Sequence, residues 1–206
     1  MFATWKKNIN RKRLKDEKFD FLFDAYDGDE MVVFDTETTG LNPRVDELLS
    51  IGAVIIKENK ILSSETFEIF IKPTEAISQE SIKIHHLREC DFETAVSALE
   101  GVEKFLRFID SRPLVGYYLE FDVAMIERYV KPWLGIKLPN KQIEVSALYF
   151  DKKISLIPQG NIDLRFDTIL QDLKLPNMGQ HNAVNDAIMA AMIYLKLTTS
   201  SYNLKQ

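Results

Sequence analysis

Apolar residues recur along the chain at two spacings, one typical of strands and the other typical of helices. Apolar runs predict strands over residues 31–36, 48–57 and 61–71, and Glu58-Asn59-Lys60 predicts a tight turn between the last two. A further short strand is predicted over Leu114–Tyr117. The sheet is therefore expected to begin with antiparallel strands joined by short connections.

Helical spacing of apolar residues predicts helices after the first three strands. Thr94 is expected to cap a helix that continues through Phe108. Further helices are predicted over Phe121–Val130, Ile162–Leu173 and Ala183–Leu197. Strands followed by alternating helix and strand favour the α/β class.

The N-terminal part mixes apolar and basic side chains over residues 3–26, which predicts a helical segment, and an acidic turn follows over residues 24–30. We therefore divide the chain into a helical extension, residues 1–30, and a domain, residues 31–200. The extension is either an arm that binds nucleic acid or a protein partner, or a segment that packs its apolar side chains on the domain. Packing is the favoured interpretation.

Two carboxylates follow the first apolar run directly. Asp35 and Glu37 come after Met31–Phe34 and precede a turn at Gly40. Alternate residues of a strand project to the same face, so both acids point together and repel each other unless a cation lies between them. Carboxylate oxygens suit Mg²⁺ or Mn²⁺, which also accept phosphate oxygens as ligands. The same pattern occurs on solvated strand faces, so this pair alone does not decide the function.

Two further acids and a histidine follow later apolar segments. Asp122 is expected in the first turn of a helix, where the helix dipole favours its charge and the carboxylate stays exposed enough to meet a metal. His181 and Asp186 are five residues apart, about 140° around a helix. Both can face one site only if His181 precedes the regular turns of the helix.

These motifs resemble those of the DEDDh group of 3′ to 5′ exonucleases, which includes the proofreading epsilon subunits of bacterial DNA polymerase III, ribonuclease T and oligoribonuclease. The resemblance runs from about Met31 to about Leu197. It implies a ribonuclease H-like α/β fold, with a mixed central sheet flanked by helices, in the exonuclease domain of residues 31–200. It also implies five catalytic residues, which are Asp35, Glu37, Asp122, His181 and Asp186.

The resemblance further implies a two-metal mechanism. Two divalent ions, Mg²⁺ or Mn²⁺, would be held by Asp35, Glu37, Asp122 and Asp186, with His181 as the general base. The substrate would be the 3′ end of single-stranded DNA, with RNA as an open alternative, and the products nucleoside 5′-monophosphates. A DNA polymerase is a candidate partner.

Six residues, four of them directly after Glu37, are candidates for contact with the terminal nucleotide. They are Thr38, Thr39, Gly40, Leu41, His85 and Phe121. Glycine removes the side chain that would block close approach, and apolar side chains can stack on any base. Core packing is the alternative for Leu41 and Phe121, and a surface or core histidine is the alternative for His85. Tyr117-Tyr118 stand where many relatives have His-Asn.

Composition narrows the class of protein. The chain has 206 residues, of which 46% are hydrophobic and 28% charged, as in ordinary globular domains. No apolar run approaches the roughly 20 residues that a membrane span needs, and a secretory signal is not recognisable, so we expect a cytoplasmic protein without membrane contact. The single cysteine, Cys90, excludes an internal disulfide.

Charge is divided unevenly between the two parts of the chain. The net charge is −5, yet residues 1–20 hold seven Lys or Arg against three acids, a net of +4, which leaves −9 for residues 21–206. An acidic body is unusual for a protein that holds a polyanion, although bound divalent ions would offset part of it.

Two other functions stay open at this point. One is a non-catalytic module that uses the same fold to hold nucleic acid or a polymerase, and the other is a metal-dependent phosphatase or endonuclease. The sequence does not decide between DNA and RNA, because that choice depends on how the site treats one 2′ hydroxyl. Oligomeric state and pathway are also left open.

Overall fold

The computed structural model describes residues 2–74, 94–155, 161–179 and 181–199. Its strands are β1 (Met31–Thr38), β2 (Leu48–Lys57), β3 (Lys60–Phe70), β4 (Leu114–Gly116) and β5 (Gln142–Glu144). Its helices are α1 (Phe2–Arg11), the 3₁₀ helix η1 (Glu17–Phe23), α3 (Ala98–Ile109), α4 (Leu119–Leu134), α5 (Val145–Ile154), α6 (Phe166–Asp172) and α7 (Ala183–Thr199). In the described part of the chain, no helix is long and apolar enough to cross a bilayer.

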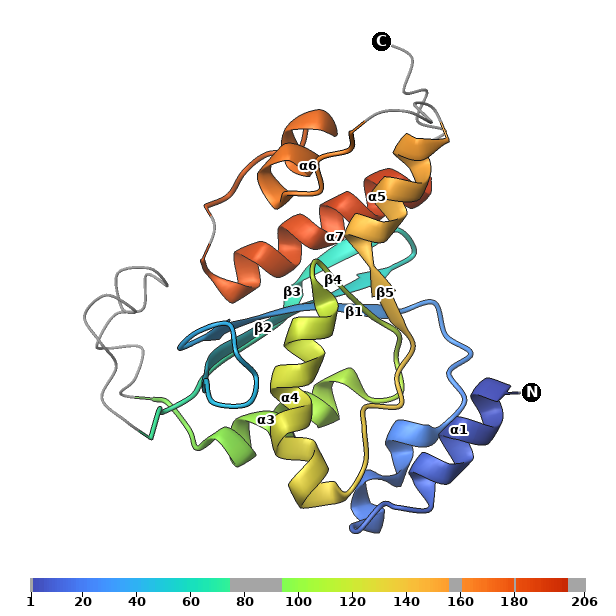
Figure 1. The fold of residues 1–206 in the computed structure, drawn as a ribbon, viewed down its shortest axis with the longest axis vertical. Helices are drawn as coiled ribbons and strands as arrows, with labels where there is room; N and C mark the ends of the chain where they lie inside the picture. Colours follow the sequence, from blue (N-terminus) through green and yellow to red (C-terminus); the bar gives the residue numbers. More distant parts are fainter. Residues whose placement is uncertain (1, 75–93, 156–160, 180, 200–206) are drawn as a thin grey trace.

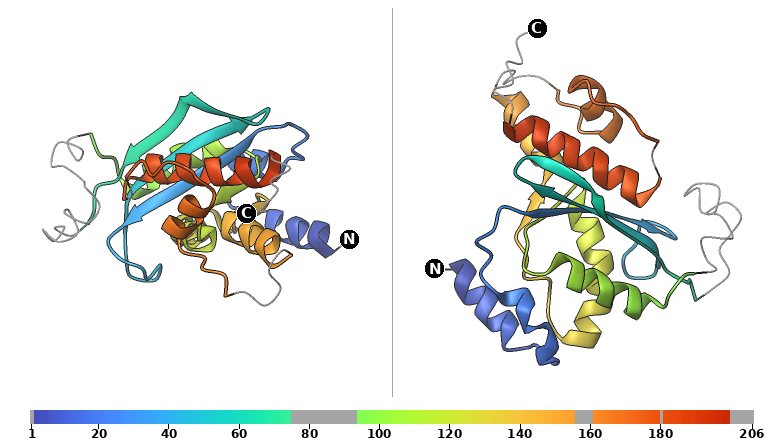
Figure 2. Two further views of the ribbon diagram at one scale, coloured as in Figure 1. Left: turned by 90° about the horizontal axis from the view of Figure 1, so that it is seen from above. Right: turned by 180° about the vertical axis from the view of Figure 1, so that it is seen from behind.

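One mixed sheet, ordered β3-β2-β1-β4-β5, separates two layers of helices. The pairs β1–β2 and β2–β3 are antiparallel, whereas β1–β4 and β4–β5 are parallel. Figure 1 shows α5, α6 and α7 on one face and α3, α4, α1 and η1 on the other, and Figure 2 shows the same layers from two further sides. The expected α/β class and mixed sheet are confirmed.

The strands β1 and β2 are buried on both faces, which explains the nearly continuous apolar sequence of β2 and of the first half of β1. Val32 and Phe34 of β1 pack in the apolar cluster that contains α3 and α4, where the Phe34 and Phe105 rings lie 4.9 Å apart. Val33, one residue out of phase, packs in the cluster that contains α7. The period of two along β1 therefore also decides which face each later residue of the strand reaches.

The predicted β2–β3 turn and the predicted helix after β4 are both present, although the bounds of the helix differ. The β2–β3 turn has positive φ at Glu58 (47°) and Asn59 (60°), between the paired residues Lys57 and Lys60. Positive φ at both central residues is the geometry of a type I′ turn, whose twist matches that of a hairpin. The helix predicted from Phe121 is present and longer, because it begins at Leu119 and includes Pro132 in its last turn.

Two predictions of local structure are wrong, and two elements are missed. Ser97, not Thr94, caps α3, because its Oγ accepts from the Glu100 N–H at 3.3 Å, while Val96 still bridges Ile71. Helix α6 begins only at Phe166, because the Asp163 carboxylate accepts from the Arg165 N–H and holds a turn. No element was predicted between residues 135 and 155, where β5 and α5 lie.

The N-terminal extension is two helical pieces rather than one, because Asp16 caps η1 through the Lys18 N–H at 3.1 Å. Phe19, Leu22 and Phe23 of η1 are buried in the same apolar cluster as α3 and α4. The favoured interpretation, packing on the domain, therefore describes η1. The domain boundary at residue 30 stays a prediction.

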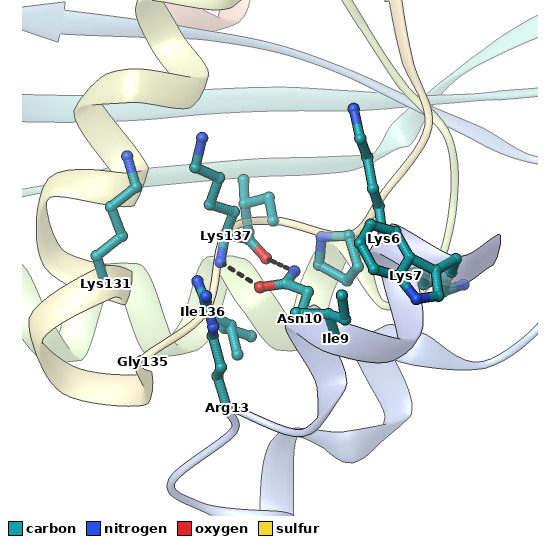
Figure 3. A pocket seen from close by; sticks show the side chains of 12 residues that line it. Lys6, Lys7, Ile9, Asn10, Arg13, Lys131, Gly135, Ile136 and Lys137 are labelled. Atoms are coloured by element: carbon teal, nitrogen blue, oxygen red, sulfur yellow. Dashed lines mark hydrogen bonds between the residues drawn. The ribbon is translucent and has the colours of Figure 1, made fainter. Parts of the chain in front are cut away.

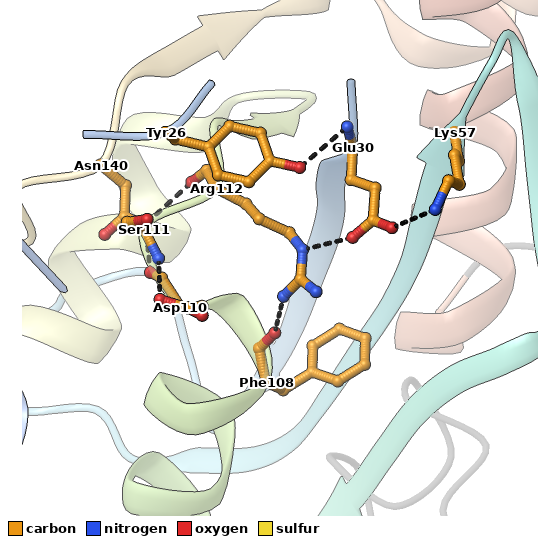
Figure 4. Close-up of polar contacts among 8 residues, drawn as sticks. All are labelled: Tyr26, Glu30, Lys57, Phe108, Asp110, Ser111, Arg112 and Asn140. Atoms are coloured by element: carbon orange, nitrogen blue, oxygen red, sulfur yellow. Dashed lines mark hydrogen bonds and ion pairs between the residues drawn. The ribbon is translucent and has the colours of Figure 1, made fainter. Parts of the chain in front are cut away.

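Polar contacts fix the chain where it enters β1 (Figure 4). The Glu30 carboxylate contacts Lys57 Nζ at 2.9 Å and accepts from Arg112 Nε at 2.7 Å. Arg112 also donates to the Phe108 carbonyl, and the Glu30 N–H donates to the Tyr26 hydroxyl. These contacts tie β1, β2 and the end of α3 together and lower the pKa of Glu30, with the Lys57 bond as the largest cause.

Gly52 allows α7 to lie directly on the sheet. A Cβ atom at Gly52 would lie 2.3 Å from both the Ala183 carbonyl carbon and the Val184 nitrogen. Gly52 pairs with Asp35 in the β1–β2 register, so this close approach brings the start of α7 beside the end of β1. The backbone contact leaves no space for any other residue.

We predict that Gly52→Ala displaces α7 and destabilises the fold, because the contacted atoms are backbone and cannot move alone. Overpacking of this kind costs roughly 1–3 kcal/mol, and more against backbone, so the melting temperature should fall by about 3 °C or more. Gly101→Ala is the matched control, because the nearest atoms to its Cβ belong to side chains, Ile71 at 3.0 Å and Val96 at 3.5 Å, rather than to backbone. Equal melting temperatures for the two variants would contradict the prediction.

Candidate active site

Three carboxylates from two elements meet at the end of β1. Asp35 and Glu37 lie on the β1 face that Val33 shares, and this face is covered by α7. Asp186 lies in the first turn of α7. Each of the three acids offers a carboxylate oxygen, and these oxygens all lie within 4.8 Å of one another. The structure therefore brings together three of the four acids that the sequence singles out.

The start of α7 is held by its own polar side chains. Asn182 Oδ1 accepts from the Asn185 N–H at 3.0 Å, which caps the helix. His181 has a φ of 66°, and its N–H donates to Asp186 Oδ2 at 3.0 Å. His181 thus precedes the regular turns, as its spacing from Asp186 requires, and its side chain is exposed. The other oxygen, Asp186 Oδ1, is buried and accepts no hydrogen bond from the described residues.

Asp122 reaches the site from α4, on the opposite face of the sheet. It lies in the first turn, as predicted, but it is only 3% exposed, so the expectation of an exposed carboxylate is wrong. Asp122 Oδ1 accepts from both the N–H and the Oγ1 of Thr36, at 2.9 and 2.6 Å. The pairing of β1 with β4 includes only Val32 and Val33, so the carboxylate takes the place of a strand partner for Thr36.

Burial and mutual repulsion shift the pKa values of these acids upward. Burial is the largest cause of the raised pKa of Asp35, and the charges of Asp122, Asp186 and Glu37 add to it. Burial also raises the pKa of Asp122 to about 7 and that of Asp186 to about 7, with the charge of Glu37 as a further cause for both. The hydrogen bonds from Thr36 and His181 oppose these shifts but do not cancel them.

Among the described residues, no cationic side chain offsets the charge of these acids. The donors of the site are carboxylate oxygens, which Mg²⁺ and Mn²⁺ prefer, and Asp186 Oδ1 is buried without a hydrogen-bond donor among the described residues. A divalent cation would restore the charged form of the acids and satisfy that oxygen. The residues present thus fit a divalent metal centre.

Glu144 is a supporting residue that the sequence analysis missed. Its Oε2 accepts from the Leu119 N–H at 2.7 Å, at the start of α4. Its Oε1 accepts from the Ser146 N–H and hydroxyl, at the start of α5. One carboxylate therefore caps two helices, of which α4 carries Asp122. No local signal marks Glu144, because the Leu119 contact forms only after the chain folds.

The last residue of β1 and the segment after it carry four of the proposed nucleotide contacts. Thr38 is buried and donates to the Gly40 carbonyl at 2.7 Å, and Thr39 donates to Asp46 at 3.2 Å. A Cβ at Gly40 would lie 2.7 Å from an Asp46 carboxylate oxygen, so the glycine makes room for Asp46. Leu41 is 84% exposed, so core packing does not account for it.

Aromatic side chains surround the start of α4. Phe121 is half-buried against the apolar cluster, and its ring stacks on that of Tyr118 with a centroid distance of 6.2 Å. Tyr118 is 59% exposed and has a φ of 53°. The Tyr117 hydroxyl donates to the Leu164 carbonyl at 2.9 Å, which directs this side chain away toward α6. His85 and Cys90 lie outside the described residues.

Comparisons with known sequences agree on one family. A sequence model of the exonuclease family, RNase_T, matches residues 32–194. The chain is 30% identical over 172 residues to DNA polymerase III PolC-type from Thermotoga petrophila, which covers 84% of this chain and 12% of that protein. It is 27% identical over 172 residues to DNA polymerase III subunit epsilon from Rickettsia felis, with coverages of 81% and 73%. The chain thus spans about an eighth of the length of the PolC-type relative.

Solved structures of nucleases share the fold. Cell-death related nuclease 4 superposes with a TM-score of 0.69 at 15% identity, covering 84% of this chain and 64% of that one. E. coli exonuclease I in complex with a dT13 oligonucleotide superposes with a TM-score of 0.63 at 15% identity, covering 82% and 41%. The ribonuclease H-like fold expected from the sequence is therefore confirmed.

We predict that Asp186→Asn stabilises the metal-free protein. In EDTA, the folded parent keeps a proton on Asp186 up to about pH 7, whereas the unfolded chain loses it near pH 3.8. The stability of the parent therefore falls as pH rises from about 4 to about 7, and it stays low above that range. Asparagine removes this loss and keeps an oxygen for the His181 N–H, so at pH 8 its melting temperature should be higher by about 3 °C or more.

The difference should vanish below pH 4, where both states of the parent are protonated. Adding Mg²⁺ or Mn²⁺ at pH 8 should raise the melting temperature of the parent more than that of Asp186→Asn. An equal response of both proteins to metal would contradict a metal centre at Asp186.

A second prediction separates the charge of the Asp122 carboxyl group from its hydrogen bonds to Thr36. Asp122→Asn keeps an acceptor oxygen for Thr36, so it should melt at or above the temperature of the parent. Asp122→Ala leaves the buried N–H and hydroxyl of Thr36 unpaired, which costs about 1–3 kcal/mol and lowers the melting temperature by several degrees. Equal loss of stability in both variants would show that the Thr36 contact is not what Asp122 supplies to the fold.

Proposed function

Because the chain belongs to the exonuclease family that its sequence matches, we propose that it removes nucleotides from the 3′ end of single-stranded DNA, with RNA as a second candidate substrate. The observation that carries the proposal is the meeting of Asp35, Glu37 and Asp186 within 4.8 Å. Acids that raise one another's pKa at a strand end lower the stability of the folded protein. Metal-dependent nuclease chemistry is a function that would require such a cluster.

The names of related proteins support the choice of substrate. Exonuclease I was solved with a bound oligodeoxynucleotide, and the sequence relatives carry the names of DNA polymerase III proteins. We extend the substrate class, single-stranded nucleic acid, to this chain. A DNA polymerase is the candidate protein partner on the same grounds.

Asp35, Glu37 and Asp186 would hold the metal, with Asp122 as a further ligand, directly or through water. When bound, two divalent ions, Mg²⁺ or Mn²⁺, would lower the pKa of the attacking water and stabilise the charge on the leaving oxygen. The Thr36 hydrogen bonds hold Asp122 in place at the edge of β1. Glu144 fixes the N-terminus of α4, and with it the direction from which Asp122 approaches.

His181 takes the proton of the attacking water in this proposal. The water oxygen forms a bond to phosphorus, the bond from phosphorus to the 3′ oxygen breaks, and that oxygen gains a proton. The products are a nucleoside 5′-monophosphate and a strand with a new 3′ hydroxyl. His181 suits the role because its backbone is tied to Asp186 while its imidazole is exposed, and imidazoles as a class titrate near neutral pH.

The terminal nucleotide would lie beside the segment that follows β1. Thr38, Thr39 and Gly40 present backbone there, and Leu41 projects an exposed apolar side chain that can contact a base. Phe121, stacked on Tyr118, is the aromatic candidate on the side of α4. His85 stays a proposed contact from the sequence alone.

We expect that, with Mg²⁺ or Mn²⁺, the protein converts a 5′-labelled single-stranded oligonucleotide into a ladder that shortens from the 3′ end. Gel analysis of the labelled products measures this, and DNA and RNA run in parallel give the preference. Mononucleotide products separate the exonuclease from the alternatives, because an endonuclease gives internal fragments and a phosphatase gives free phosphate. No product from either strand would contradict the proposal.

Two variants and EDTA treatment test the proposed roles in the same assay. Asp35→Asn and EDTA should each abolish the ladder, because both remove the proposed metal centre. His181→Ala should keep the metal-dependent rise in melting temperature but lower the rate by roughly 100- to 10,000-fold, the usual contribution of a general base. An unchanged rate for His181→Ala would exclude it as the base.

A further inference from the structure

A pocket of about 750 Å³ lies where α1 meets the C-terminal end of α4 (Figure 3). Its walls come from α1 with the residues that follow it, and from the end of α4 with the segment up to Pro139. The acidic site is elsewhere, because Asp122 lies in the first turn of α4 and the pocket adjoins the last. The catalytic chemistry therefore does not account for this pocket.

The pocket is positively charged. Its lining includes five cationic side chains and no carboxylate, the cations being Lys6, Lys7, Arg13, Lys131 and Lys137. Lys131 pairs with Glu127 at 2.7 Å, and this is the only ion pair that the five cations make with described residues. Figure 3 shows the ammonium groups of Lys6, Lys131 and Lys137 extending to the same side. Residues 21–206 carry a net charge of −9, so this positive pocket lies on an acidic body.

The two walls are joined by specific hydrogen bonds. The Asn10 side chain pairs with the Lys137 backbone, donating to its carbonyl at 2.8 Å and accepting from its N–H at 3.0 Å. The Lys15 N–H donates to the Leu134 carbonyl at 3.0 Å, and Lys15 Nζ donates to the Pro132 carbonyl at 2.9 Å. The Lys137 side chain takes no part in these bonds, so the pocket is assembled without using its charge.

An aromatic side chain completes the pocket. Trp5 lines it and is 59% exposed, although large aromatic side chains are usually buried. Cations beside an exposed aromatic ring match the two needs of single-stranded nucleic acid, which presents phosphates and unstacked bases. An acidic peptide would use the cations but has less use for the ring.

We propose that this pocket binds the sugar–phosphate backbone of single-stranded nucleic acid, upstream of the 3′ end held at the acidic site. Asp122 and Lys131 lie nine residues apart on α4, about 14 Å along the helix axis. A strand of a few nucleotides can extend over that distance. The position of the pocket relative to the acidic site rests on the proposed function, whereas the binding itself does not.

Fluorescence anisotropy with a 5′-labelled oligothymidylate of about 20 nucleotides tests the binding, in EDTA to prevent metal-dependent hydrolysis. Lys6→Gln combined with Lys137→Gln removes two charges. It should weaken binding roughly 10-fold at about 0.1 M salt and lower the slope of log affinity against log salt by about 1.4. Trp5→Ala should weaken binding by a similar factor, and Trp5→Phe should restore most of the loss.

Lys60→Gln combined with Lys104→Gln is the matched control, because it removes the same charge from the β2–β3 hairpin and α3. The control should bind like the parent. If the pocket variant keeps the affinity and salt slope of the parent, the inference is overturned, and an acidic protein segment becomes the occupant to test.

Turnover separates this inference from the proposed function. The pocket variant should raise KM for the long oligonucleotide roughly 10-fold with unchanged kcat, and should cleave a dinucleotide like the parent. If the parent cleaves no oligonucleotide but the variant still loses affinity, the pocket inference stands and the proposed function fails. If the parent cleaves and the variant shows the parental KM, only the pocket inference fails.

Discussion

The main constraint on the structure is the repulsion among the carboxylates of Asp35, Glu37 and Asp186. The fold holds these groups within 4.8 Å of one another. Electrostatic repulsion alone would separate these groups, because burial and like charge both oppose their ionised forms. Close contacts at several points keep them together. We infer that this repulsion lowers the free energy of unfolding of the metal-free protein, and that a divalent cation bound among the acids would restore it.

Each contact that holds the acids comes from a different element. Gly52 lets the start of α7 lie against β2, which places Asp186 opposite Asp35. The Thr36 N–H, beyond the end of the β1–β4 pairing, takes Asp122 as its partner. Glu144 caps α4 and α5 together. A mixed sheet with a short β4 therefore explains how acids from both of its faces lie near one strand end.

How far the sequence predicts this arrangement differs by residue. Asp35 and Glu37 are predictable because the period of two along a strand is local, and the fold follows from family resemblance. The burial of Asp122 and the role of Glu144 are not predictable, since both depend on partners far along the chain. The short strand β5 was missed because parallel pairing with β4, rather than its own sequence, makes it a strand. The pocket is not predictable for the same reason, because its walls come from residues 5–13 and residues 131–139, which are far apart in the sequence.

The central claim is that the acidic cluster is a divalent metal centre, and anomalous diffraction from crystals grown with Mn²⁺ tests it most directly. We expect an anomalous peak bounded by carboxylate oxygens of Asp35, Glu37 and Asp186. The peak should be absent from crystals of Asp35→Asn. A parent crystal with no anomalous density among these three acids would contradict the account.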